Sequence, residues 1–502
     1  MRRCTALLAL ATTLAMVTGC STSADTGDGD DRKPGTPALE MTSSEVIADA
    51  AGNGVDTSAR LFESSDVVVV AADTPEDQAR GVHLAVAGGV PMLTAGDTAT
   101  IDAEIARLGA SCVITVGDVG TLAEGPELVV APPAVTPASM SAGVAASLDR
   151  DTAEGMDGLT HTRHPLAMPA MLATDATSLA SIATARAAGA EVHVLAHPDP
   201  RVTSVSMALV SDQDVLALGE QFGSGDRLER AIELAANGEL PGGGGLLFPG
   251  RRMVAFYGHP WGGDLGVMGE QPPAEAVARV QEHITNYQAL EEQPVIPAFE
   301  IIVTVASAFP GEDGKYTNIG DPADFTGYID AITEAGGYAF LDLQPGQASF
   351  IEQAKVYEEL LKRPNVGLAL DPEWNLQPGE RPLQRVGHAE AAEINEVADW
   401  LAALVRDNNL PQKGLIVHQF QLQMLRDRDQ INTDHPELSF ILHADGHGGP
   451  EQKFDTWNVM RQDLSDDWFM AWKNFIDEDN PTFTPEETYN NVDPRPWFVS
   501  YQ

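Results

Sequence analysis

The chain has 502 residues, with 74 acidic against 30 basic side chains and a formal net charge of −44. A surface this acidic repels phosphate backbones, so the composition argues against a nucleic-acid-binding protein. The length exceeds what one hydrophobic core usually holds, so at least two domains are expected.

The first 20 residues have the pattern of a bacterial lipoprotein signal. Arg2 and Arg3 form a short basic segment, residues 6–17 are apolar, and a Val-Thr-Gly-Cys sequence ends at Cys20. The apolar run is shorter than the about 20 residues that a membrane-spanning helix needs. We expect cleavage after residue 19 and lipidation of Cys20, which would anchor the protein on the outer face of the cell membrane. The alternative is an ordinary cleaved secretion signal.

Residues 20–54 are predicted to be a lipidated, disordered tether, because residues 21–37 are rich in Ser, Thr, Asp and Gly. Of the three cysteines, Cys4 would leave with the signal and Cys20 would carry the lipid. Cys112 lies in an apolar run, which predicts a buried, inert thiol and no disulfide in the folded protein.

Residues 55–240 are predicted to form an α/β domain with a parallel sheet. Short apolar runs alternate there with Ala-rich helical stretches, which is the pattern of βαβ units. An internal repeat with an offset of 102 residues matches Val70 with Leu172, Met92 with Val194, and residues 113–116 with 215–218. We place the domain boundary at the glycine run 242–245, the alternative being a loop inside one larger domain.

This domain resembles the type 2 cell-wall-binding repeat over residues 60–230. The resemblance is carried by residues 66–72 leading into a helix, by Gly-Gly-Val-Pro-Met-Leu-Thr at 88–94, and by residues 107–117, where Leu-Gly-Ala precedes an apolar strand. It implies non-covalent attachment to a wall polymer. The chain departs from the family in having Gly117-Asp118 where Gly-Gly is common, and two units where three are common. An α/β scaffold without a wall ligand is the alternative.

Residues 250–502 are predicted to form a (β/α)8 TIM barrel. Helical spacing near 3.6 marks residues 274–290, 325–335, 350–361 and 389–406. Eight β/α units in about 250 residues match the size of a TIM barrel. The predicted strands are residues 253–257, 299–305, 338–343, 366–370, 415–418, 439–443, 468–472 and 497–501.

Polar and aromatic residues concentrate where these strands end, which is where TIM barrels carry their active sites. The expected catalytic residues are Asp342, Asp371, Glu373 and Asp445. The expected substrate-binding residues are Tyr257, His259, Trp374, Gln419, His443, Trp472 and Lys473. Trp261 could also offer a flat apolar face to a sugar ring, whereas Glu300 is expected to be a structural ion-pair partner.

The sequence Asp371-Pro-Glu373 resembles the end of the signature of barrel glycoside hydrolases, including chitinase-like ones. The resemblance implies that Glu373 is the general acid and that the charge of Asp371 helps it to hold a proton. The earlier aspartate of the chitinase motif is missing, since Gly367 and Ala369 stand there. A glycosidase needs a second carboxyl, which Asp342 or Asp445 could supply.

We therefore expect a surface lipoprotein that hydrolyses or remodels a cell-envelope polysaccharide without a cofactor. One alternative is a metal-dependent hydrolase with a divalent metal at His443, Asp445 and His447, because imidazole and carboxylate ligands together suit Zn²⁺ or Mn²⁺. The other is a non-catalytic protein that only binds carbohydrate or the cell wall.

Overall fold

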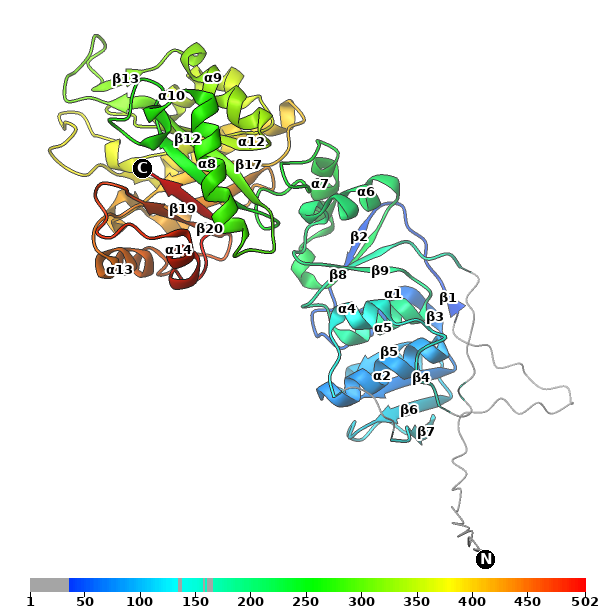
Figure 1. Cartoon of the computed structure of the whole chain (residues 1–502). Helices are drawn as coiled ribbons and strands as arrows, with labels where there is room; N and C mark the ends of the chain where they lie inside the picture. Colours follow the sequence, from blue (N-terminus) through cyan, green and yellow to red (C-terminus); the bar gives the residue numbers. More distant parts are fainter. Residues whose placement is uncertain (1–35, 134–137, 157–158, 160–165) are drawn as a thin grey trace, which may run out of the picture. The chain divides into compact units, whose positions relative to one another are not determined.

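The computed structural model describes residues 36–133, 138–156, 159 and 166–502, which form two compact units (Figure 1). The first unit holds the described residues up to Pro198 together with Gln213–Leu228. The second holds Asp199–Asp212 and Glu229–Gln502. The glycine run that we predicted as the boundary therefore lies inside the second unit.

The first unit contains two four-stranded parallel sheets. One has the order β5 (Met92–Thr94), β4 (Val67–Ala71), β6 (Cys112–Val116) and β7 (Glu127–Val130). The other has the order β2 (Glu45–Ile47), β10 (Leu216–Leu218), β8 (Met171–Thr174) and β9 (Val192–Leu195). Strands β4, β5 and β6 thus have the same mutual arrangement as β8, β9 and β10.

Helices connect these strands, and their ends follow local capping rules. Thr74 caps α2 (Pro75–Gly88) by accepting a hydrogen bond from the Asp77 amide, and Gly89 ends the helix at a φ of 66°. The other helices of the first unit are α1 (Val55–Leu61), α3 (Thr98–Leu108), α4 (Ala142–Ser147) and α5 (Leu179–Ala187). α6 (Ser204–Asp212) belongs to the second unit, and α7 (Gly225–Ala235) begins in the first unit and ends in the second. The strands β1 (Thr36–Pro37) and β3 (Phe62–Ser64) pair antiparallel.

Two expectations for the N-terminal half need correction. Residues 45–47 are not part of a disordered tether, because β2 pairs in parallel with β10 and so belongs to a sheet. Cys112 is buried as expected, at 4% exposure, but it is disulfide-bonded, which corrects the expectation of a free thiol. The predicted signal and the lipid on Cys20 also lie outside the described residues.

The second unit contains a closed barrel of eight parallel strands, which confirms the predicted TIM barrel. In barrel order the strands are β11 (Arg252–Gly258), β12 (Val295–Ala306), β14 (Tyr338–Leu343), β15 (Val366–Leu370), β17 (Lys413–His418), β19 (Leu438–Ala444), β20 (Trp468–Asn474) and β21 (Phe498–Tyr501). Pairing of β11 with both β12 and β21 closes the ring. All eight predicted strands are present.

The barrel helices cover the outside of the strands (Figure 1). They are α8 (Pro273–Gln288), α9 (Pro322–Glu334), α10 (Phe350–Val356), α11 (Glu358–Leu361), α12 (Ala391–Asp407), α13 (Pro450–Met460) and α14 (Pro485–Asn491). Short strands lie in the loops: β13 (Thr317–Ile319) pairs with β12, and β16 (Ala389–Glu390) pairs with β18 (Leu425–Arg426). None of the helices in the described part of the chain has the length and apolar character that a membrane crossing requires.

The inside of the barrel is layered, because alternate residues of each strand point inward. One inward residue of every strand joins a single apolar cluster: Ala255, Ala298, Phe340, Ala369, Ile416, Ile441, Ala471 and Phe498. Two positions after each of these apolar residues, the chain has a buried polar residue. These eight residues are Tyr257, Glu300, Asp342, Asp371, His418, His443, Lys473 and Ser500. A ring of polar side chains therefore lies above an apolar layer, toward the carboxyl ends of the strands.

The apolar layer is closed at the amino ends of the strands by the segment before β11. Leu247 and Phe248 belong to the same buried cluster, and the Leu247 amide donates to Gln412 Oε1 at 2.8 Å. The buried guanidinium of Arg251 donates to the carbonyl of Leu246 at 2.9 Å. The barrel is thus filled from one end, which leaves the polar end as the place where a ligand can enter.

Candidate active site

A cavity of about 570 Å³ opens at the carboxyl ends of the barrel strands. Its lining includes six of the residues that the sequence predicted for the site: Tyr257, Asp371, Glu373, Trp374, Asp445 and Lys473. They come from β11, from the ends of β15 and β19, and from β20. Strand alternation places Tyr257 and Lys473 inward, whereas Glu373 lies on a 3-10 turn after β15 that Asp371 caps, so the strand alternation predicted for Asp371 and Glu373 does not describe this pair. Asp342 and His443 are fully buried in the polar ring and are not among the residues that line the cavity.

Three predicted substrate-binding residues have other roles. His259 accepts a hydrogen bond from the Trp261 amide at 3.1 Å, and Gln419 donates to the carbonyls of residues 421 and 422. Trp472 is 1% exposed and packs against Trp457 and Phe483 in the outer core. None of the three lines the cavity, so the structure contradicts the predicted contact of Trp472 with a sugar and gives no support to the other two.

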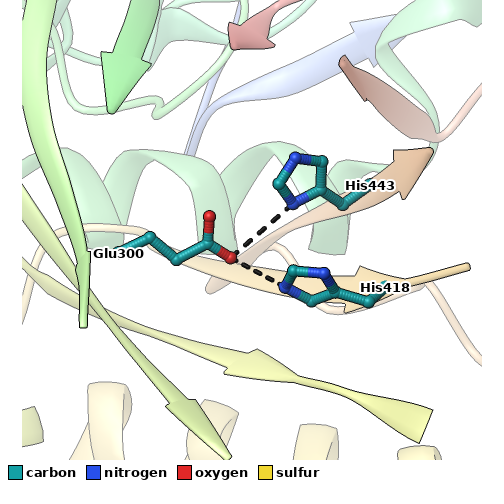
Figure 2. Close-up of side chains that lie close together, drawn as sticks. All are labelled: Glu300, His418 and His443. Atoms are coloured by element: carbon teal, nitrogen blue, oxygen red, sulfur yellow. Dashed lines mark hydrogen bonds and ion pairs between the residues drawn. The ribbon is translucent and has the colours of Figure 1, made fainter. Parts of the chain in front are cut away.

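The polar ring is organised around His418, which lies between two carboxylates. Its Nδ1 is 2.8 Å from Asp445 Oδ2, and its Nε2 is 2.7 Å from Glu300 Oε1. Figure 2 shows Glu300 facing both imidazoles, with His443 Nδ1 3.6 Å from the same carboxylate oxygen. Glu300 is therefore an ion-pair partner, as predicted, but it lies at the centre of the site. Ser500 Oγ lies 3.0 Å from the other ring nitrogen of His443.

The side chains of Glu300, His418 and His443 are close enough to hold a metal ion (Figure 2). This group differs from the predicted set of His443, Asp445 and His447, because His447 is exposed at the cavity and is not a member. A metal needs a lone pair on the imidazole nitrogen. Since both nitrogens of His418 face carboxylate oxygens at hydrogen-bonding distance, the group fits a buried ion network better than a metal site.

Three carboxyl groups of the site hold their protons more tightly than usual. Burial raises the pKa of Glu373 to about 7, and the negative charge of Asp445 acts in the same direction. Burial raises the pKa of Asp342 to about 6, against the attraction of His418, and it holds the pKa of Asp371 well above its ordinary range. The predicted cause for Glu373, the charge of Asp371, is therefore corrected to burial and Asp445.

Asp445 and Glu300 show the opposite behaviour. Burial opposes the ionisation of Asp445, but the hydrogen bond and the charge of His418 outweigh it and lower the pKa of this carboxyl. In the same way the imidazoles of His443 and His418 lower the pKa of Glu300 against its burial. Burial also opposes the cation on His418, but Glu300 and Asp445 raise its pKa well above the ordinary value. The site therefore contains both protonated and ionised carboxyl groups at neutral pH.

Hydrogen bonds fix several of these groups. Tyr257 donates its hydroxyl to Asp342 Oδ2 at 2.7 Å, and the Lys473 ammonium lies 3.7 Å from the centre of the Tyr257 ring. Asp371 accepts from the Glu373 amide at 3.1 Å and so caps the turn that carries Glu373. Asp342 thus fixes the Tyr257 hydroxyl, and Asp371, which itself lines the cavity, fixes the turn that carries Glu373.

No known protein family matches the sequence, and no curated protein matches it. Among solved structures the chain is similar to cellobiohydrolase II (Cel6A) from Humicola insolens in complex with glucose and cellotetraose, at 12% identity and a TM-score of 0.18, over 39% of this chain and 57% of that chain. It is similar to the catalytic core domain of the cellobiohydrolase Cel6A from Chaetomium thermophilum at 12% identity and a TM-score of 0.18, over 55% and 73% of the two chains. Likeness of this size carries no argument about function, which rests on the site itself.

The raised pKa of Glu373 predicts a cost to stability at alkaline pH. The pKa of Glu373 is near 4.5 in the unfolded chain and about 7 in the folded protein, so between these pH values only the folded protein keeps the proton. The contribution of Glu373 to the free energy of unfolding is therefore most favourable below pH 4.5 and declines as pH rises to 7. Glu373→Gln should remove this decline, so that the variant gains about 3 kcal/mol relative to the parent between pH 4.5 and pH 8. Calorimetric melting at both pH values measures it. Glu282→Gln, on the exposed face of α8, should show no such gain, and parallel pH dependence in all three proteins would contradict the assignment.

Proposed function

We propose that the barrel hydrolyses a glycan of the cell envelope, with Glu373 as general acid and Asp445 as the second catalytic carboxylate. The observation that carries the proposal is that both groups line one cavity while their surroundings move their pKa values in opposite directions. Glycoside hydrolysis requires one carboxyl that gives a proton and one that is ionised.

The expected step begins with transfer of the Glu373 proton to the oxygen of the leaving sugar. The ionised Asp445 then either attacks the anomeric carbon or takes a proton from the attacking water. His418 holds Asp445 Oδ2, and Oδ1 has no hydrogen-bond partner among the described residues. In this proposal Asp342 and Asp371 orient Tyr257 and Glu373, in place of the catalytic roles expected for them.

The cavity wall has the mixed character that suits a sugar. Trp374, Tyr257 and Phe475 supply flat apolar surface, and Lys473 and Gln344 supply polar groups. Sugars present apolar C–H faces and hydroxyl edges, so aromatic faces and hydrogen-bonding side chains can bind them together.

The proposed substrate follows from the proposed location. We propose that Cys20 carries the lipid anchor and that the N-terminal unit is a pair of wall-binding repeats. The shared arrangement of β4, β5, β6 and of β8, β9, β10 supports the two-fold repeat. A lipid anchor and wall-binding repeats would hold the barrel beside envelope polysaccharide.

The catalytic assignment predicts the effect of two isosteric substitutions. Glu373→Gln removes the transferable proton and Asp445→Asn removes the charge, so each should lower turnover of a susceptible envelope polysaccharide by about a hundredfold or more. Release of reducing ends measures turnover, and Glu282→Gln is the matched control. Because Glu373 must be protonated, the activity of the parent should fall as pH rises through about 7. Binding of the polysaccharide without turnover by the parent would contradict catalysis and favour a carbohydrate-binding protein.

The lipid anchor predicts the outcome of Cys20→Ala. Lipoprotein processing uses the cysteine thiol, so this variant should lose labelling by a fatty-acid probe and should keep its uncleaved signal. Gel mobility and probe fluorescence in cells measure both effects, with Ser23→Ala, which leaves every cysteine in place, as the control that keeps the label. Equal labelling of the Cys20 variant and the parent would refute the anchor.

A further inference from the structure

The position of His418 between two carboxylates determines its protonation state. A carboxylate oxygen only accepts hydrogen bonds, so each ring nitrogen that faces one must donate. A neutral imidazole has a single N–H and could satisfy only one of the two contacts, at 2.7 and 2.8 Å. All three side chains are almost fully buried, at 0% exposure for His418 and Glu300 and 6% for Asp445. With both carboxylates ionised, His418 is an imidazolium.

The imidazolium connects two layers of the site. Glu300 lies on β12 and does not line the cavity, whereas Asp445 follows β19 and does. His418 on β17 is the only described side chain that hydrogen-bonds Asp445, and it uses one carboxylate oxygen while the other stays unpaired. Glu300 is thus the counter-ion that keeps the cation in place behind Asp445.

We propose that Glu300 and His418 are positioning residues that keep Asp445 ionised and fix the orientation of its carboxylate at the cavity wall. This inference rests on the proposed function only for the role of Asp445 in hydrolysis. Glu300 contacts neither the cavity nor a substrate, so its effect passes through His418. A merely structural ion pair would stabilise the barrel without setting the titration of Asp445.

Other charged groups also face Asp445 and must be separated from this effect. Lys473 on β20 and Lys453 on α13 act as cations, and Glu373 beyond β15 acts as a neighbouring carboxyl. Lys453 is paired with Asp479, and Lys473 lies over the Tyr257 ring. Asp371 and His443 complete the set. Because none of these groups donates a hydrogen bond to Asp445, we expect the loss of the His418 cation to dominate.

The test is the titration of Asp445 in the full chain, followed by NMR of protein labelled with ¹³C-carboxyl aspartate. Asp445→Asn identifies the resonance. In the parent this carboxyl should titrate below the ordinary aspartate range, and in Glu300→Gln and His418→Gln its pKa should rise by about one unit or more. Glu300→Gln keeps the shape and an acceptor for His418, so it remains informative if His418→Gln fails to fold. His435→Gln is the matched control, because His435 lies before the amino end of β19 and faces Asp399, and it should leave the titration of Asp445 unchanged.

The pH dependence of turnover separates positioning from a structural role. In Glu300→Gln the acidic limb should move to higher pH by the same amount, while the rate above that limb stays within about threefold of the parent. An unchanged Asp445 titration in a folded Glu300→Gln variant would overturn the inference. If the pKa of Asp445 shifts in Glu300→Gln but the parent hydrolyses no polysaccharide, the coupling between Glu300 and Asp445 is supported and the proposed function is overturned.

Discussion

Every strand of the barrel must turn alternate residues inward, and this constraint determines where the chemistry of the protein lies. The inward positions form an apolar layer near the middle of the barrel, and the next inward positions are polar in all eight chain segments. The segment containing Leu247 and Phe248 fills the amino end. The apolar layer keeps water from reaching the polar ring from the amino end of the barrel. The polar groups must therefore find their hydrogen-bond partners within the ring or at the cavity.

The site, with the ring and the two cavity carboxyl groups Glu373 and Asp445, holds more carboxyl groups than cations, and burial decides which of them keep their protons. Asp342, Asp371 and Glu373 keep their protons to higher pH because burial penalises the charged form. Glu300 and Asp445 stay ionised because they share the cation on His418. One fold thereby places a proton donor and a carboxylate beside the same cavity, which is the requirement of acid-assisted glycoside hydrolysis.

The sequence predicts the eight barrel strands and the end of the barrel that carries the candidate site. Both depend on local periodicity and on where polar residues interrupt apolar runs. The alternation also decides which residue of an adjacent pair faces into the barrel. Lys473 and Trp472 are adjacent on β20, so only one can face inward, and the structure gives that place to Lys473. By the same rule His418 and Gln419 face opposite sides, and the inward one, His418, is a site residue.

Other features depend on contacts between distant segments and are not visible in local sequence. The strand at residues 45–47 is too short and too polar in its surroundings to be recognised before its pairing with β10 is known. The central place of Glu300 follows from the register of β12 against its neighbours, which brings it within reach of β17. The pKa of Glu373 depends on burial and on Asp445, which is 72 positions away in the chain.

Neutron diffraction from a deuterated crystal at about pD 6 would locate the protons of the site. We expect deuterium on both ring nitrogens of His418 and on the carboxyl group of Glu373, with none on Asp445. A His418 ring with one deuterium and a protonated Asp445 would contradict this expectation, because the site would then lack the ionised carboxylate on which the proposed reaction depends.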